Sequence, residues 1–215
     1  MTKIKLVVFD MDGTLLQARS CWNYIHQHFG IDNKEMLKMY MEHKINDQEF
    51  AESDIRLWEQ SSNVHINEAY INSILDEIEP IDGAEDLIHS LHQKGIQTVI
   101  LSGGIKYLAV KWAEKWNMKE VIANQLIDDE SGNLKVVIES SGHAKGPIMD
   151  ALLERLNFSK KEVAAVGDTV VDIPLFERAG LAIAVNTDDQ KVIDEVDYHL
   201  KEKNLRNLIP IITSR

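Results

Sequence analysis

A short apolar stretch that ends in two aspartates constrains this chain more than any other feature of its sequence. Residues 3–9 are rich in β-branched side chains and predict a buried strand. Asp10 and Asp12 follow directly, and Gly13 and Thr14 then suit a sharp turn. Neighbouring carboxylates repel each other and resist burial, so a fold that holds them together needs a cation or a reaction. The simpler alternative is a charged turn after an edge strand.

The rest of the sequence favours a parallel sheet with helices on both faces, because predicted strands and helices alternate. The predicted strands span residues 96–101, 121–126, 134–138, 163–166 and 181–185. The predicted helices span residues 84–93, 105–117, 145–156, 173–179 and 188–196. We therefore predict the α/β class, with a doubly wound, mostly parallel, Rossmann-like sheet.

A helical segment interrupts this alternation directly after the first strand. Residues 16–79 contain no convincing strand, and their apolar positions predict four short helices. We expect an α/β core of residues 1–15 and 80–215, with residues 16–79 as an inserted helical cap. Open α/β sheets bind ligands at the carboxyl ends of their strands, so an insert at this point would act as a lid.

Composition and charge exclude several kinds of partner. The chain has 35 acidic residues against 23 Lys and Arg, a formal net charge of -12, which argues against nucleic acid and anionic membranes. We expect no signal peptide, and no apolar run in the sequence approaches the roughly 20 residues that span a bilayer. Cys21 is the only cysteine, which fits a reducing compartment. We expect a cytoplasmic protein of undetermined oligomeric state.

Three residues outside the first strand are candidates for holding a phosphate group. Ser102 and Gly103 follow a predicted strand and precede a predicted helix, where a hydroxyl group and glycine amides can contact phosphate oxygens. The same pair is also common at an ordinary helix start. Lys145 begins another predicted helix and could supply positive charge, although a solvent-facing lysine is the simpler interpretation.

A second acidic pair follows another predicted strand. Asp168 lies just after residues 163–166, and Asp172 comes four residues later. Together with Asp10 and Asp12 they form an oxygen-rich site suited to Mg²⁺, a hard cation that shares substrate phosphate oxygens. Asp172 has an equally good alternative role as the N-cap of the helix that follows.

These residues together fit the hydrolysis of a phosphate monoester. A carboxylate attacks the phosphorus atom in line, cations and amides neutralise the charge, and an acid protonates the leaving oxygen. Asp10 fits the nucleophile and Asp12 the acid, because two carboxylates in different environments can divide these roles.

In the order of its motifs, the chain resembles the haloacid dehalogenase superfamily, and within it the phosphoserine phosphatase branch with a small helical cap. The resemblance rests on residues 10–14, 101–104, 144–146 and 166–168, followed by Asp172. It implies a doubly wound core and hydrolysis through an aspartyl-phosphate intermediate.

The resemblance also implies roles for individual residues. Asp10 becomes the aspartyl-phosphate, and Asp12 protonates the leaving group and later activates water. Mg²⁺ is held by Asp10, Asp168 and the main-chain carbonyl of Asp12, with support from Asp172. The phosphoryl group is held by Ser102, Gly103 and Lys145.

At one position the chain differs from that branch, and at two others the role of the residue has alternatives. The branch carries a glutamate that meets the substrate ammonium group seven residues after its acid/base aspartate, where this chain has Arg19. A cation there would repel an ammonium group and attract a carboxylate or phosphate. Arg56 resembles the branch's carboxylate-binding arginine at slightly different spacing, and a solvated helix arginine is an equal alternative. His143 is the only histidine near the predicted site, and a surface role is the simpler interpretation.

The first hypothesis is a Mg²⁺-dependent phosphomonoesterase that hydrolyses a small acidic phosphorylated metabolite through an aspartyl-phosphate. One alternative is a phosphatase or phosphotransferase for a non-amino substrate such as phosphoglycolate or a sugar phosphate. An alternative from another class is a receiver-like signalling module that accepts a phosphoryl group. Receiver folds are shorter and lack a helical lid, which disfavours that alternative.

Overall fold

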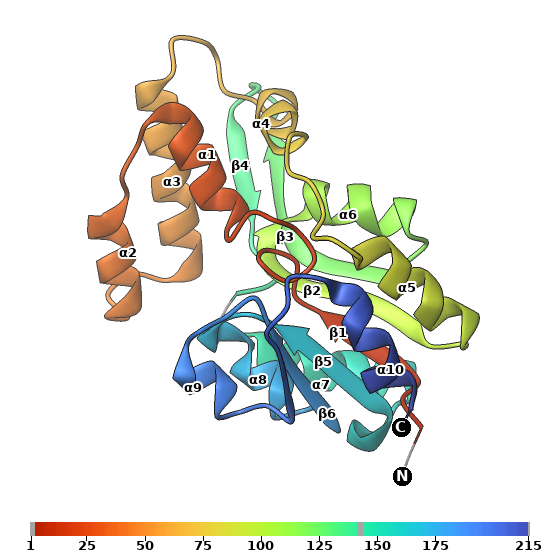
Figure 1. The fold of residues 1–215 in the computed structure, drawn as a ribbon. Coiled ribbons are helices and arrows are strands. Elements are labelled where there is room, and N and C mark those ends of the chain that lie inside the picture. The colour runs from red at the N-terminus through yellow and green to blue at the C-terminus, as the bar shows by residue number, and fades with distance from the viewer. Residues whose placement is uncertain (1–2, 142–143, 215) are drawn as a thin grey trace.

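A seven-stranded sheet forms the centre of the computed structural model, which describes residues 3–141 and 144–214 (Figure 1). The sheet has the strand order β4-β3-β2-β1-β5-β6-β7. Every neighbouring pair is parallel except β3 and β4. The strands are β1 (Leu6–Phe9), β2 (Gln97–Ile105), β3 (Glu120–Asp128), β4 (Leu134–Val137), β5 (Val163–Gly167), β6 (Leu181–Val185) and β7 (Tyr198–Leu200). The predicted α/β class and mostly parallel sheet are confirmed.

Helices cover both faces of the sheet, as parallel strands require. Leu6 and Val8 of β1 pack in one apolar cluster with α7, α8 and α9, while Val7 and Phe9 pack in another with α5, α6 and α10. Successive side chains of a strand point to opposite faces, which explains this division. The helices are α5 (Ala84–Gln93), α6 (Lys106–Lys115), α7 (Lys145–Leu156), α8 (Ile173–Phe176), α9 (Gln190–Ile193) and α10 (Leu208–Thr213).

Four helices separate β1 from α5, namely α1 (Cys21–Phe29), α2 (Lys34–Met41), α3 (Asp47–Ser61) and α4 (Glu68–Leu75). Figure 1 shows α1, α2 and α3 grouped beside β4. The helix α3 begins at a capping box in which Asn46 and Glu49 each bond the other's backbone amide. Trp58 of α3 is fully buried and belongs to the same apolar cluster as Val7 and Phe9 of β1, so these helices pack continuously with one face of the core. No helix in the described ranges is long and apolar enough to cross a membrane.

The structure differs from the sequence predictions mainly at element ends. The strand β2 continues to Ile105 through a register shift against β3 that begins at Leu101. Ser102 and Gly103 therefore lie in the irregular end of a strand, and the helix α6 begins three residues after Gly103. The helix α9 is shorter than predicted, and β7 and α10 were not predicted.

Truncation of Leu87 should test the packing of α5 on the sheet. Leu87 is fully buried in the larger apolar cluster, so Leu87→Ala should lower the free energy of unfolding by about 2–5 kcal/mol. The exposed Glu85 on the same helix is the control, and Glu85→Ala should cost less than about 1 kcal/mol. Urea denaturation measures both, and equal losses would contradict the assigned packing.

Candidate active site

A buried lysine joins two aspartates at the carboxyl ends of β1 and β5. Nζ of Lys145 donates hydrogen bonds to Oδ1 of Asp10 at 2.7 Å and to Oδ1 of Asp172 at 2.6 Å. Lys145 is only 1% exposed, and a buried ammonium group needs such partners. Burial opposes its charge, but the two carboxylates outweigh burial and raise the pKa of Lys145. The surface alternative for Lys145 is therefore wrong.

Asp172 also organises the turn that follows β5. Its Oδ2 accepts hydrogen bonds from the backbone amides of Asp168 and Thr169, both at 3.0 Å. A side chain at Gly167 would place Cβ 2.5 Å from Cβ of Asp172, so only glycine allows this approach. Asp172 occupies the N-cap position of α8, as the alternative predicted, but its side chain makes no capping hydrogen bond to that helix.

Three buried carboxylates converge beside Lys145. One oxygen from each of Asp10, Asp168 and Asp172 lies within 4.8 Å of the others. Burial raises the pKa of Asp168 to about 8. Burial also raises the pKa of Asp10, to about 7, although Lys145 opposes this shift. Oδ2 of Asp168 is buried and accepts no hydrogen bond from the described residues. An orphaned oxygen in a cluster of carboxylates fits a hard divalent cation.

The loop after β1 closes over Asp168. Gly13 has φ of +71°, and a Cβ at this position would lie 2.3 Å from Oδ2 of Asp168. Oγ1 of Thr14 lies 3.5 Å from Oδ1 of the same carboxylate. Gly13 therefore serves both the left-handed turn and the close approach of the loop to the acidic cluster.

Asp12 lies in a different environment from Asp10. Its Oδ2 accepts a hydrogen bond from the backbone amide of Cys21 at 2.8 Å. Its Oδ1 is buried and has no hydrogen-bond partner within residues 3–141 and 144–214. Burial raises the pKa of Asp12, which favours retention of a proton. The two aspartates of the motif are thus suited to different tasks.

Ser102 and Gly103 lie beside β1 on the neighbouring strand β2. Oγ of Ser102 is buried and accepts a hydrogen bond from the amide of Gly104 at 3.1 Å. The carbonyl of Gly103 accepts hydrogen bonds from Nε1 of Trp22 at 3.1 Å and from Nδ2 of Asn124 at 2.9 Å. These bonds fix the peptide plane of Gly103. The ends of β5, β1 and β2 therefore carry the predicted site residues side by side.

The structure does not bring the two predicted arginines to one place. A guanidinium nitrogen of Arg19 lies 3.6 Å from Oδ2 of Asp168, and another donates a hydrogen bond to Asn186 at 3.4 Å. Arg56 is exposed on α3, 3.9 Å from Glu52. His143 lies outside the described residues.

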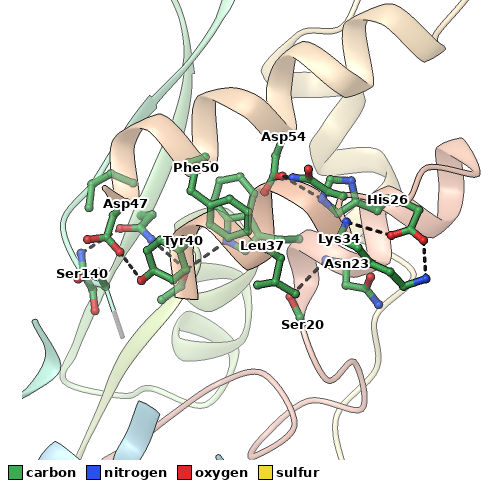
Figure 2. A pocket seen from close by; sticks show the side chains of 18 residues that line it. Ser20, Asn23, His26, Lys34, Leu37, Tyr40, Asp47, Phe50, Asp54 and Ser140 are labelled. Atoms are coloured by element: carbon green, nitrogen blue, oxygen red, sulfur yellow. Dashed lines mark hydrogen bonds and ion pairs between the residues drawn. The ribbon is translucent and has the colours of Figure 1, made fainter. Parts of the chain in front are cut away.

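A cavity of about 520 Å³ extends from this site into the helical group α1–α3 (Figure 2). At the core end it is lined by Gly103, Asn124 and Ser140, and at the helical end by His26 and Asp54. The sequence predictions missed the last two. The available signal was Asp54 itself, since it shares the buried face of α3 with Ala51, Ile55 and Trp58.

Residues 4–180 match the family model of the haloacid dehalogenase-like hydrolases, so the chain belongs to this family. It is similar to the phosphoserine phosphatase of Methanocaldococcus jannaschii, with 28% identity over 98% of each chain. The family and these relatives make the chain a phosphatase. The family match also favours an enzyme over a receiver-like module.

Solved structures give the same result. A substrate-bound phosphoserine phosphatase complex has a TM-score of 0.80 and 27% identity, with 99% of this chain and 100% of that chain covered. A phospho-aspartyl intermediate analogue of phosphoserine phosphatase has a TM-score of 0.78 and 26% identity, with 98% and 100% covered. The fold and the family thus agree over nearly the whole chain.

The raised pKa of Asp168 predicts how stability depends on pH in the metal-free protein. The pKa is about 8 in the folded chain and about 4 when unfolded, so the folded state binds more protons between these values. The contribution of Asp168 to the free energy of unfolding therefore falls as pH rises from about 4 to about 8. Thermal unfolding across this range measures the fall.

Asp168→Asn is the comparison for that measurement, because it removes the titrating group and keeps the shape. The free energy of unfolding of the variant minus that of the unmodified protein should increase as pH rises. Adding Mg²⁺ at pH 8 should stabilise the unmodified protein more than the variant, since the cation favours the ionised carboxylates. A difference that shrinks with rising pH would contradict the assignment.

Proposed function

We propose that this chain is a Mg²⁺-dependent phosphomonoesterase that forms an aspartyl-phosphate on Asp10. The observation that carries the proposal is the contrast between the two aspartates of one motif. Oδ1 of Asp10 accepts a hydrogen bond from Nζ of Lys145. Its Oδ2 accepts no hydrogen bond from a described residue and is available for attack. Asp12 sits close by with a raised pKa. The similarity to a phospho-aspartyl intermediate analogue supports the same chemistry.

In the first step, Oδ2 of Asp10 attacks the phosphorus atom as the bond from phosphorus to the leaving oxygen breaks. Asp12 gives its proton to that oxygen, so the product leaves as a neutral alcohol. Lys145 holds the other oxygen of Asp10, which fixes the direction of attack. The products of this step are the alcohol and the phosphorylated Asp10.

In the second step, the same groups act in the reverse order. Asp12, now ionised, takes a proton from a water molecule, and the water oxygen attacks phosphorus. The bond from phosphorus to Asp10 breaks and releases inorganic phosphate. Ser102 and the fixed peptide of Gly103 would receive the phosphoryl oxygens, because both lie at the end of the strand beside Asp10.

Asp10, Asp168 and the main-chain carbonyl of Asp12 would hold Mg²⁺, and Asp172 would support it. The cation supplies positive charge that neutralises the phosphate oxygens and keeps the carboxylates ionised. The feature of this chain that supports the assignment is the buried Oδ2 of Asp168, which accepts no hydrogen bond from the described residues and has the Arg19 guanidinium 3.6 Å away.

Residues 16–79 are proposed as the cap that chooses the substrate, because α1, α2 and α3 line the cavity that opens beside Gly103. The volume of that cavity, about 520 Å³, suits a small phosphorylated metabolite. The single buried thiol of Cys21 supports a reducing location, for which we propose the cytoplasm.

Loss of either aspartate should stop turnover at different steps. With para-nitrophenyl phosphate and Mg²⁺, Asp10→Asn should lower kcat by roughly a thousandfold or more, because the amide is a poor nucleophile. Asp12→Asn should lower kcat by about 10²–10⁴. Asp188→Asn, at an exposed position, should leave activity unchanged. Steady-state kinetics would contradict the proposal if Asp10→Asn kept the activity of the unmodified protein.

A further inference from the structure

The cavity beneath the helical group carries a buried carboxylate that the proposed reaction does not use. Asp54 is 2% exposed; its Oδ1 lies 3.1 Å from Nε2 of His26 and accepts a hydrogen bond from Nδ2 of Asn33. Its Oδ2 accepts no hydrogen bond from the residues that the structure describes. Figure 2 shows Asp54 on the wall of the cavity. Because Asp54 lines the cavity, this oxygen is open to a donor or a cation that enters it.

His26 does not neutralise Asp54. Nε1 of Trp58 lies 3.1 Å from Nδ1 of His26, and an indole nitrogen only donates hydrogen bonds. Nδ1 of His26 must therefore be the acceptor, which places the imidazole proton on Nε2 and makes the ring neutral. His26 therefore brings no positive charge to the carboxylate of Asp54.

The remaining charges of the cavity add to this negative potential. Asp47 lines the same cavity and accepts a hydrogen bond from the hydroxyl of Tyr40 at 2.6 Å. Lys34, with a side chain 86% exposed, pairs with Asp32 at 2.5 Å, and these two charges cancel. Among the described lining residues no other lysine or arginine is present. Asp47 and Asp54 therefore have no cationic partner among the described residues that line the cavity.

Aromatic rings connect these carboxylates to the catalytic end of the cavity. Tyr40 and Phe50 stack with their centroids 4.8 Å apart, and Figure 2 shows both beside Asp47. Trp22 stacks on Trp58 at 5.6 Å, and its Nε1 bonds the carbonyl of Gly103. Faces of aromatic rings attract organic cations, so the rings and the two aspartates favour the same kind of ligand.

We propose that the leaving group of the substrate carries an organic cation, a primary amine or a quaternary ammonium group, and no carboxylate. The inference rests on the proposed phosphomonoesterase function and narrows its substrate. Asp54 binds the cation, Asp47 adds to the negative potential about two helical turns away on α3, and Trp22, Tyr40 and Phe50 line the same cavity. A carboxylate on the leaving group would meet two aspartates, because neither Arg19 nor Arg56 lines the cavity. The ammonium group of phosphoserine fits this site, but its carboxylate does not.

The first test compares small phosphate monoesters whose leaving groups differ in charge. Values of kcat/KM are measured with Mg²⁺ for O-phosphoethanolamine, phosphocholine, O-phosphoserine and glycerol phosphate, with para-nitrophenyl phosphate as the generic ester. At least one cationic ester should exceed both phosphoserine and glycerol phosphate by about tenfold or more. A preference for phosphoserine or for glycerol phosphate would overturn the inference. If para-nitrophenyl phosphate is not hydrolysed either, the proposed function itself fails.

The second test changes Asp54. Asp54→Asn keeps an oxygen for His26 and Asn33 and removes the charge, so it should lower the ratio of kcat/KM for the cationic ester to that for para-nitrophenyl phosphate by about tenfold. The matched control is Glu52→Gln, two residues away on the exposed face of α3, which should leave the ratio unchanged. An unchanged ratio in Asp54→Asn would overturn the inference.

A third measurement needs no variant and covers the case in which Asp54→Asn does not fold. Choline and its neutral carbon isostere are compared as inhibitors of para-nitrophenyl phosphate hydrolysis by the unmodified protein. Choline should inhibit at least about tenfold more strongly, because only the cation gains from the two aspartates and the rings. Equal inhibition, or stronger inhibition by the neutral isostere, would overturn the inference.

Discussion

The contact of the Lys145 ammonium group with two buried carboxylates is the interaction on which the rest of this site depends. It joins three segments that are distant in the sequence, because Asp10 follows β1, Asp172 follows β5 and Lys145 begins α7. Removing one partner of such a buried group costs about 3–5 kcal/mol, whereas an apolar replacement of the whole set is often neutral. Stability alone therefore does not require these charges, and chemistry at Asp10 gives them a purpose.

The same contact separates the tasks of the carboxylates. Asp10 is fixed by a cation, Asp12 by a backbone amide, and Asp168 keeps an oxygen without a hydrogen bond from the described residues. Each environment favours a different state of a group that would otherwise titrate alike. A nucleophile, an acid and a metal ligand can thus arise from one residue type, and the fold supplies the differences.

Much of this site could be predicted from the sequence, because the groups that carry chemistry follow strands. The strand before Asp10 and the helix at Lys145 could be predicted from short apolar runs, and parallel strands end at the same edge of the sheet. The burial of Lys145 could not be predicted from the sequence, since its partners lie 27 and 135 residues away along the chain. The bulged end of β2 depends on pairing with β3 and leaves no local signal.

The cavity was harder to predict for a related reason. Its charge depends on Trp58, which sets the tautomer of His26 and so leaves Asp54 uncompensated. These contacts join residues of α1 and α3, and no pattern in the sequence indicates them. Arg56 resembled a residue of a known motif, yet its side chain is exposed on α3 beside Glu52, whereas Arg19, which departs from that motif, lies beside Asp168. Substrate choice is therefore a property of the folded insert.

The central claim is that Asp10 itself takes up the phosphoryl group. The most direct test is rapid acid quenching of the protein during turnover of a phosphomonoester with Mg²⁺, followed by mass spectrometry of its peptides. The account predicts a phosphoryl group on the peptide that contains Asp10, lost on treatment with hydroxylamine and absent from Asp10→Asn. Turnover in which no phosphorylated peptide accumulates even with Asp12→Asn, or in which the label lies on another residue, would contradict it.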